Sequence, residues 1–334
     1  MSMSQNDTSS PKLLDAKTYV KDLTKHVARA QKRVNLTSLI LTDNAYTHDL
    51  IEAMIDAAKR EVVVTVSIDT FAFNQLGGYV PFINRLSTRS RAMTAMVNHL
   101  KAAGVSFAWL GRNLKHNPFG GVTHLKWAVV DDITFCFGGV NLYEGGIESA
   151  DYMLKFTQAS LADTIAQQHE AIINSQRTHI PYPGFTGEDT NGTIYIDSGK
   201  KYESVIYDRL SELAKQATHV LVVTQYCPSG ALVTHLKDKS DVYYNQPAKT
   251  PYPDRLLIQY GAWRTGLRSQ YTRAQYLHAK FMIFTMPSGE KIAMTGSHNF
   301  SYSGVMFGTR EVALETSDSG IIKQLEEFHK THIA

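Results

Sequence analysis

The sequence predicts an α/β protein built from two similar halves, because a strand–helix–strand pattern and a polar motif each occur twice. The first strand–helix–strand unit is "LILTDNAYTHDLIEAMIDAAKREVVVTVSID" at 39–69, and the second is "TIYIDSGKKYESVIYDRLSELAKQATHVLVVTQY" at 193–226. Each contains apolar residues at helical spacing followed by a β-branched run suited to a buried strand. These helical residues are Leu50, Ile51, Met54, Ile55 and Ala58 in the first unit and Val205, Ile206, Leu210 and Leu213 in the second. Strands that alternate with helices are typical of an α/β sheet.

A stretch rich in proline, glycine and polar residues, "RTHIPYPGFTGEDTNG" at 177–192, marks the expected boundary between the halves. We expect an N-terminal tail and lead-in helix at 1–33, a first domain at 34–185 and a second at 186–334. The polar start "MSMSQNDTSSPKL" resembles a frayed tail and lacks the basic and apolar regions of a signal peptide. The segment 243–276 lacks clear periodicity, which predicts a long functional loop leading into the second motif.

Composition sets broad limits on the class of protein. The chain has 334 residues, 43% of them hydrophobic, with two cysteines and a net charge of +3. This charge is too small to indicate a nucleic-acid binder and too small to exclude one. Two thiols in such a chain are compatible with a reducing compartment. No stretch approaches the roughly twenty apolar residues of a membrane span. We therefore expect a cytoplasmic protein, or one lying peripherally on a membrane surface.

The repeated polar motif is the main functional signal. "THLKWAVVDDITFCFGGVN" at 123–141 contains His124, Lys126, Gly139 and Asn141, and "LHAKFMIFTMPSGEKIAMTGSHN" at 277–299 contains His278, Lys280, Ser297 and Asn299. The histidines are 154 residues apart and the asparagines 158. The four extra residues fall around "TMPSGEK", whose proline and glycine predict a longer hairpin turn. An insertion at a turn leaves the flanking strands in register.

These side chains suit a phosphodiester. Because residues two apart share a face of a strand, each half would present an imidazole, an ammonium and a carboxamide on one surface. Lysine supplies a point charge for phosphate oxygens, and Asn and Ser donors hold developing charge. Small residues such as Gly139 let an anion approach the backbone. Histidine can attack phosphorus or protonate a leaving oxygen. No metal or cofactor is needed, since the lysines supply the positive charge.

Two acids follow the motifs at similar offsets. Asp151 lies ten residues after Asn141, and Glu311 lies twelve after Asn299. Either could be an ordinary solvated carboxylate, but the offsets favour a hydrogen bond to a histidine ring that fixes its tautomer. One His-x-Lys pair on a strand is common by chance, whereas two copies with matched glycine, serine and asparagine positions are not. A zinc site is disfavoured because Cys-x-x-Cys and His-x-x-x-His pairs are missing.

The motif resembles the signature of the phospholipase D superfamily, His-x-Lys-x4-Asp-x6-Gly-Ser-x-Asn, which occurs twice in that superfamily. The first copy fits at every spacing, with Asp131 as the structural acid and Gly139 in place of serine. In the second copy Thr285 stands where the acid should be and the hairpin is longer. This departure puts the structural role of the acid in doubt for that half and leaves the phosphate ligands in place.

The resemblance implies two similar phospholipase-D-type α-β-α sandwich domains related by a pseudo-twofold axis. The active site would lie at their interface and act without metal through a phosphohistidine intermediate. His124 would be the nucleophile and His278 the general acid and then base. Asp151 would orient His124, and Glu311 would orient His278.

The "GGVN" and "ADYMLKF" stretches look most like bacterial cardiolipin-synthase-like and phosphatidylserine-synthase-like members, which transfer a phosphatidyl group between alcohols. The expected substrate is therefore a phospholipid or another phosphodiester, and aromatics in 243–276 either lie at a lipid interface or pack within the loop. A metal-independent nuclease-type phosphodiesterase is the alternative, although it would need a basic groove. A non-catalytic phosphate-binding module is a third class. Loss of a motif His or Lys would indicate it, and both motifs keep these residues. The acceptor alcohol, or water in its place, and the oligomeric state stay open.

Overall fold

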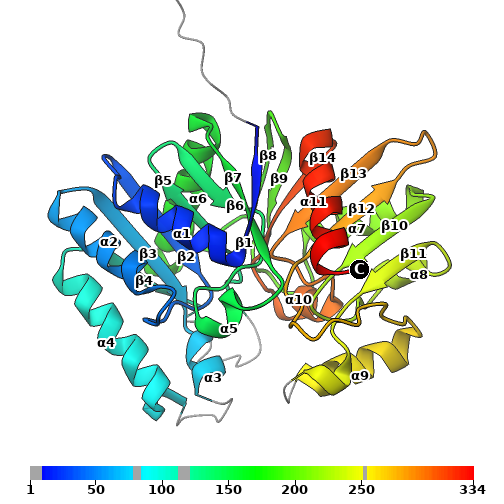
Figure 1. Cartoon of the computed structure of the whole chain (residues 1–334), viewed down its shortest axis with the longest axis horizontal. Coiled ribbons are helices and arrows are strands. Elements are labelled where there is room, and N and C mark those ends of the chain that lie inside the picture. The colour runs from blue at the N-terminus through cyan, green and yellow to red at the C-terminus, as the bar shows by residue number, and fades with distance from the viewer. Residues whose placement is uncertain (1–9, 78–83, 112–120, 251–253) are drawn as a thin grey trace, which may run out of the picture.

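The computed structural model describes residues 10–77, 84–111, 121–250 and 254–334 and forms two α/β halves side by side (Figure 1). The elements of the first half are β1 (Lys12–Asp15), α1 (Ala16–Val27), β2 (Arg33–Ser38), α2 (His48–Lys59), β3 (Val63–Asp69), α3 (Ala72–Leu76), η1 (Asn84–Leu86), α4 (Thr88–Ala102), β4 (Ser106–Leu110), β5 (Trp127–Val130), β6 (Ile133–Cys136), α5 (Glu144–Ile147), β7 (Tyr152–Phe156) and α6 (Ala159–Thr178).

The elements of the second half are β8 (Phe185–Asp189), β9 (Gly192–Ile196), α7 (Val205–Gln216), β10 (His219–Val223), α8 (Leu232–Leu236), β11 (Ser240–Tyr243), η3 (Pro247–Lys249), α9 (Asp254–Thr265), β12 (Phe281–Thr285), β13 (Lys291–Gly296), α10 (Tyr302–Phe307), β14 (Val312–Thr316) and α11 (Ser319–His332).

Each half contains a seven-stranded mixed sheet. The strand orders are β1-β7-β6-β5-β2-β3-β4 and β11-β10-β12-β13-β14-β9-β8. In the first sheet β2 and β3 are parallel and β5, β6 and β7 are antiparallel to their neighbours; β10 and β11 with β12, β13 and β14 repeat this pattern. The halves are therefore two similar α/β domains, as predicted.

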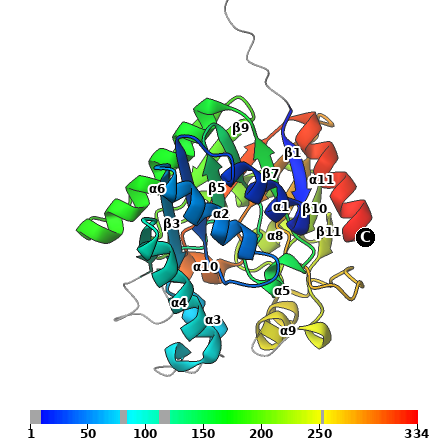
Figure 2. The same cartoon turned by 60° about the vertical axis from the view of Figure 1, so that its left-hand side comes forward.

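Apolar side chains form three layers of core. One cluster packs α1, α2 and α4 on the outer face of the first sheet, and another packs α7 and α8 on the second. The third cluster combines residues of both halves, including Leu161 and Ile165 of α6 with Ile321 and Leu325 of α11. Figure 2 shows α1, α2 and α4 together on one side of the first sheet. The two sheets therefore share a continuous apolar interface, which holds one domain firmly against the other.

The internal repeat is real, but the units matched in the sequence are offset from those of the fold. The strand β9 of the second unit pairs with β14, as β1 pairs with β7, whereas β2 pairs in parallel with β3, as β10 does with β11. The unit β9-α7-β10 thus corresponds to β1-α1-β2. The matching of 39–69 with 193–226 was wrong, because any apolar strand followed by an amphipathic helix gives the same pattern.

The N-terminal region contributes more to the fold than a tail would. The expected lead-in helix exists as α1, and residues 12–15, expected in the tail, form β1 at the edge of the first sheet. Residues 1–9, where the frayed tail was also expected, lie outside the described residues. The domain limits at 33/34 and 185/186 stay predictions.

The segment 243–276 is not a structureless loop. It contains η3 and the twelve-residue helix α9, of which only Ile258 is fully buried. The helix shows no amphipathic periodicity in the sequence, because Leu257, Ile258 and Ala262 spread apolar residues over sides other than that of Leu256 and Trp263. No helix in the described ranges is long and apolar enough to cross a membrane.

Asp131 stabilises the first hairpin and lies outside the cluster of motif side chains. It occupies the turn between β5 and β6 with φ 52°, and its carboxylate accepts hydrogen bonds from the backbone N–H groups of Gln31 (3.0 Å), Lys32 (2.8 Å) and Arg33 (3.1 Å). In the second hairpin Thr285 pairs with Lys291 around the longer turn, and its carbonyl accepts from the backbone and hydroxyl of Thr218. Backbone contacts thus replace the missing acid there.

We predict that Asp131→Ala lowers the free energy of unfolding by about 2 kcal/mol, because three backbone hydrogen bonds to a charged group are lost. Asp132→Ala is the matched control: the neighbouring acid is exposed, and its ion pair with Lys32 is long at 3.8 Å. Urea unfolding of both variants tests the difference. Equal stabilities for the two variants would remove the structural role assigned to Asp131.

Candidate active site

The motif residues flank the strands rather than lie on them. His124 and Lys126 immediately precede β5, and Gly139 and Asn141 follow β6; the second motif flanks β12 and β13 in the same way. The expectation that alternation along a strand aligns them was therefore wrong in detail. The hairpins carry both ends of each motif to the same edge of their sheet, where the chain can leave the ladder and approach the other domain.

Two matched backbone bridges join the domains at this edge. The N–H of His124 donates to the carbonyl of Arg310 (2.8 Å), and the N–H of His278 donates to the carbonyl of Ala150 (3.0 Å). Thr123 forms an isolated parallel bridge with Arg310, and Leu277 forms one with Ala150. Each histidine thus lies against the residue that precedes the acid of the opposite domain.

The acids consequently pair with the histidines across the interface. Both carboxylate oxygens of Glu311 lie 2.9 and 3.0 Å from Nδ1 of His124, and Oδ2 of Asp151 lies 2.6 Å from Nδ1 of His278. The assignment of Asp151 to His124 and of Glu311 to His278 was therefore wrong. The sequence correctly singled out both acids, but the interdomain bridges determine which ring each acid contacts.

Gly139 and Ser297 occupy equivalent positions with different surroundings. The N–H of Gly139 donates to the carbonyl of Tyr152, and that of Ser297 donates to the carbonyl of Val312. The Ser297 hydroxyl donates to the carboxylate of Glu311. A Cβ at Gly139 would lie 2.7 Å from Oδ2 of Asp151 and 2.9 Å from the carbonyl oxygen of His278. Glycine thus leaves room for the shorter acid beside His278.

The glycine that precedes each of these residues is required by close backbone contact. A Cβ at Gly138 would lie 1.9 Å from the carbonyl oxygen of Tyr152, and one at Gly296 would lie 2.1 Å from that of Val312. Backbone atoms cannot move aside as a flexible side chain can, so only glycine fits. The first glycine of each motif therefore holds the end of one strand against its neighbour.

Both lysines are buried at the interface. Nζ of Lys126 donates to the carbonyl of His124 (2.8 Å), and Nζ of Lys280 donates to the carbonyl of His278 and lies 3.1 Å from Nδ1 of its ring. Burial lowers the pKa of Lys126 to about 7 and that of Lys280 to about 8, although nearby Glu311 and Asp151 oppose the shift. When these lysines are protonated, water therefore screens their positive charge only weakly.

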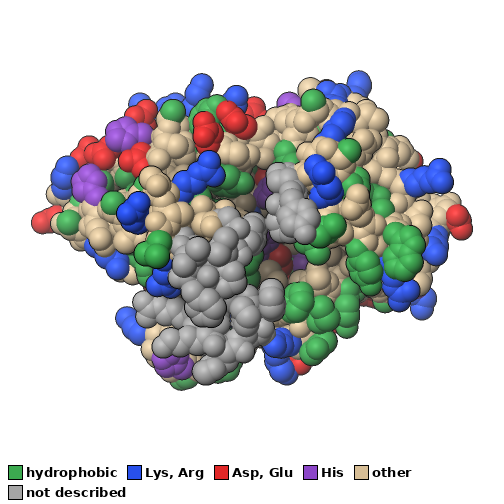
Figure 3. All heavy atoms as spheres, turned by 90° about the horizontal axis from the view of Figure 1, so that it is seen from below, with side chains coloured by type: hydrophobic (Ala, Val, Ile, Leu, Met, Phe, Trp, Pro, Cys, Tyr) green, Lys and Arg blue, Asp and Glu red, His purple; other side chains and the backbone are tan. Residues whose placement is uncertain are grey.

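The histidines are held in their neutral form when the site is empty. Burial and then Lys126 lower the pKa of His124 well below its usual value, and burial and then Lys280 lower that of His278 to about 3. Burial raises the pKa of Glu311 to about 7. The charges of Lys126 and Lys280 act on both rings, so the two motifs form one electrostatic cluster. Figure 3 shows a hollow between the domains with histidine and acidic side chains at its floor.

The side-chain oxygen atoms of Asn141 and Asn299, the last residues of the two motifs, are also buried. Within the described part of the chain, the side-chain oxygen of each has no hydrogen-bond partner. Such buried polar atoms are costly unless something binds there. The same feature thus recurs at equivalent positions of the two motifs.

The sequence did not indicate a polar network beside the second motif. Tyr226 and Tyr276 donate through their hydroxyls to the two carboxylate oxygens of Asp254, each at 3.2 Å, and the Gln225 amide donates to both hydroxyls at 3.0 Å. Tyr276 lies two residues before His278. The four residues come from three separate parts of the chain, namely the adjacent Gln225 and Tyr226, the start of α9 and the segment before His278, so no motif in the sequence joins them.

We predict that Gly139→Ser, which restores the signature of the superfamily, lowers kcat/KM by about 10²-fold, because the new Cβ displaces Asp151 from His278. Ser297→Gly is the matched control, since it removes a hydroxyl without a clash, and its loss should be smaller. Steady-state kinetics and melting curves of both variants test this. Wild-type turnover by Gly139→Ser would show that the Asp151 contact is not needed.

Comparisons with known proteins agree with the geometry. The family model described as "Cardiolipin synthase, PLD-like domain" matches residues 23–176 and 192–332. No curated protein matches the sequence. Among solved structures, phosphatidylserine synthase from Haemophilus influenzae Rd KW20 has a TM-score of 0.71 at 13% identity, with 97% of this chain and 86% of that chain covered. Polyphosphate kinase from Porphyromonas gingivalis has a TM-score of 0.60 at 12% identity, with 95% of this chain and 49% of that chain covered. These two structures share the fold, and the family model matches one repeat in each domain, so the chain belongs to the cardiolipin-synthase-type family of phospholipase-D-like domains.

Proposed function

We propose that the protein cleaves phosphodiesters through a phosphohistidine intermediate, and that its substrate is a phospholipid that it hydrolyses or whose phosphatidyl group it transfers. The crossed histidine–carboxylate pairs are the observation that supports this most strongly. Each ring donates Nδ1–H to a buried carboxylate, which leaves Nε2 as the reactive nitrogen. The family description and the fold shared with a phosphatidylserine synthase support a phospholipid.

The first step forms a bond between Nε2 of His124 and phosphorus and breaks the bond from phosphorus to the leaving alcohol oxygen. That oxygen takes a proton from Nε2 of His278. The lysines and the Asn141 and Asn299 carboxamides hold the charge on the remaining phosphate oxygens. Water or an acceptor alcohol then gives a proton to His278 and attacks phosphorus, which breaks the bond to His124.

The substrate itself helps to charge the acid. In the empty site burial and Lys280 lower the pKa of His278 to about 3, so the ring is neutral near pH 7. A bound phosphodiester brings a negative charge beside the ring, and an adjacent opposite charge raises the pKa of an imidazole. His278 would thus take up its proton as substrate binds, while His124, oriented by Glu311, stays neutral for attack.

Anion affinity should fall as the pH rises from about 6 to 9. Lys126 loses its proton near pH 7 and Lys280 near pH 8, and Glu311 gains negative charge near pH 7, so each change weakens the attraction. Sulfate is a suitable probe because it stays a dianion throughout. We expect roughly a tenfold or greater loss of affinity by titration calorimetry. Lys280→Met should bind more weakly at low pH and show a shallower pH dependence; rising affinity would contradict the charge model.

The substrate is tested by incubating the purified protein in EDTA with phosphatidylglycerol, phosphatidylcholine and single-stranded DNA in separate reactions. We expect phosphatidylglycerol to be consumed, with cardiolipin as the product of transfer or phosphatidic acid as the product of hydrolysis. His124→Ala serves as the inactive control. Cleavage of DNA alone would replace the lipid assignment with a nuclease, and a strict need for a divalent metal would contradict the mechanism.

A further inference from the structure

The helix α9 exposes its large apolar side chains to solvent. Trp263 is 78% exposed, Tyr260 63%, Leu257 59% and Leu256 49%. Residues 256, 260 and 263 are spaced four and three apart and therefore share one side of the helix. Ile258, on the opposite side, is fully buried. A surface helix normally shows the reverse pattern, so this face is built to contact something other than water.

The charge around this face is one-sided. Between residues 249 and 273 the chain has five basic side chains and one acidic one. The acid is Asp254, whose carboxylate accepts hydrogen bonds from Tyr226 and Tyr276 and is thus occupied within the protein. Arg264 and Arg268 are exposed beside the apolar face. Cations around an apolar helix face complement a surface that presents anionic groups over an apolar interior.

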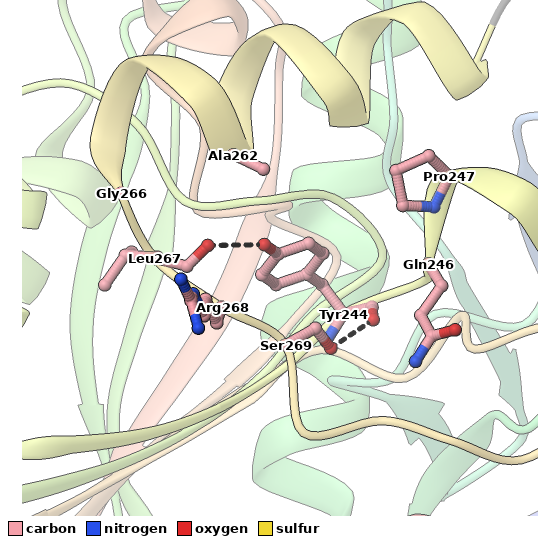
Figure 4. Close-up of a pocket in the computed structure, with 8 residues that line it drawn as sticks. All are labelled: Tyr244, Gln246, Pro247, Ala262, Gly266, Leu267, Arg268 and Ser269. Carbon is pink, nitrogen blue, oxygen red and sulfur yellow. Dashed lines mark hydrogen bonds between the residues drawn. The ribbon is translucent and has the colours of Figure 1, made fainter.

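A recess lies next to the end of α9. A cavity of about 440 Å³ lies between the end of α9 and the chain that follows β11, lined by Tyr244, Gln246, Pro247, Ala262, Leu267 and Arg268 among others. Figure 4 shows Tyr244 at its centre, with its hydroxyl bonded to the carbonyl of Leu267. The recess thus places Arg268 and apolar walls at the C-terminal end of α9, on the side of the helix that carries Ala262.

The helix is also connected to the active site. Asp254 begins α9 and is hydrogen-bonded by Tyr276, which lies two residues before His278. In the view from below, hydrophobic side chains gather beside the hollow between the domains, over the region where α9 lies in Figure 1 (Figure 3). A surface that contacts this face would therefore lie next to the entrance of the site.

We propose that α9 is a membrane-docking helix, which inserts Leu256, Leu257, Tyr260 and Trp263 into the interface of an anionic phospholipid surface and presents the cleft to it. Tryptophan and tyrosine favour the interface between acyl chains and headgroups, and flanking arginines pair with lipid phosphates. Cations flank the apolar side chains of this face, and anionic phospholipids offer both an apolar interior and phosphate groups to match them. This inference rests on the proposed action on phospholipids.

Vesicle co-sedimentation with the full chain tests the docking without turnover. We expect binding to vesicles of phosphatidylcholine with phosphatidylglycerol and weaker binding to phosphatidylcholine alone. Trp263→Glu and Leu257→Glu should each weaken binding by about tenfold or more, because each loses an apolar side chain from the interface. Ile180→Glu is the matched control, since Ile180 is 66% exposed on the boundary segment. Unchanged binding by the α9 variants would overturn the proposal.

Tryptophan fluorescence gives a second measurement at the same site. Of three tryptophans, Trp127 is buried and Trp109 partly buried, so Trp263 should dominate a blue shift when anionic vesicles are added. Trp263→Phe should abolish the shift and keep most of the binding. No shift in the wild-type protein would overturn the proposal, and so would a dimer that dissociates in Leu257→Glu, because the face would then contact a second copy.

Kinetics separate this inference from the proposed function. The α9 variants should turn over a soluble phosphodiester, bis(p-nitrophenyl) phosphate, at the wild-type rate and lose activity only on vesicles. If the wild-type protein cleaves phospholipid in detergent micelles but does not bind vesicles, the docking helix is wrong and the function stands. If it binds vesicles through α9 but cleaves no phospholipid, the docking stands and the proposed function fails.

Discussion

Replacing either His124 or His278 with alanine should lower turnover by about 10⁴-fold or more, but only one of the two variants should still form a covalent intermediate. Nucleophile and acid act as one unit, so removal of either stops the cycle. With a good leaving group, such as p-nitrophenolate, no proton donor is needed. His278→Ala should then release one equivalent of p-nitrophenol and accumulate the adduct, whereas His124→Ala should not.

Acid-free quenching and mass spectrometry should place the phosphorus on the peptide that contains His124. The reason for this choice is the fuller first motif, which has Asp131 at the expected spacing, whereas the second motif has Thr285 there. His298→Asn is a suitable control, since this buried histidine accepts a hydrogen bond from the Phe300 backbone and lies outside the proposed chemistry. It should keep activity within about tenfold. An adduct on His278 would reverse the two roles.

The sequence predicted the members of the site well because their chemistry leaves a signal that packing does not explain. His124, Lys126 and Asn141 have no packing reason to recur together in the second half. The structure gathers these residues and their counterparts at one interface. Burial, which the sequence does not show, then lowers the pKa values of both histidines and both lysines.

The fold class was also predictable, whereas the pairing of strands was not. Apolar runs and helical spacing identify α2, α7, β3 and β10, but they carry no information on which strand lies next to which. The partner of β9 is β14, more than a hundred residues away in the sequence. This pairing depends on how the whole sheet packs on its core, which no local pattern shows. The repeat was therefore detected with the wrong alignment of its units.

The helix α9 escaped prediction for a physical reason. Prediction from periodicity needs apolar residues on one side of a helix, and in α9 they are spread over several sides, with Leu256 and Trp263 on one and Ile258 on another. A segment that lacks the expected pattern was read as irregular. A helix with apolar residues on several sides gives the same weak signal as a loop.

The crossed pairing of acids and histidines in the structure and the same-half pairing expected from the sequence predict different effects of mutating each acid. Asp151 and Glu311 have similar offsets from the asparagines of their own halves, so each was expected to orient its own histidine. The backbone hydrogen bonds from His124 to Arg310 and from His278 to Ala150 instead place each histidine beside the acid of the opposite half. Loss of one acid should therefore affect the histidine of the opposite half.

Glu311→Gln should lower kcat by about 10³-fold, because the amide no longer fixes the Nδ1–H tautomer of His124, and it should abolish the burst of p-nitrophenol. Asp151→Asn should cause a similar loss on phospholipid but retain the burst, as His278→Ala does, because it disturbs only the acid. Glu311→Asp and Asp151→Glu keep the charge and should recover part of the activity. A merely structural role would lower both phases equally. The opposite result, in which Asp151→Asn abolishes the burst and Glu311→Gln retains it, would have two explanations. Either each carboxylate acts on the histidine of its own half, or the two histidines have exchanged roles. The position of the trapped adduct would decide between them.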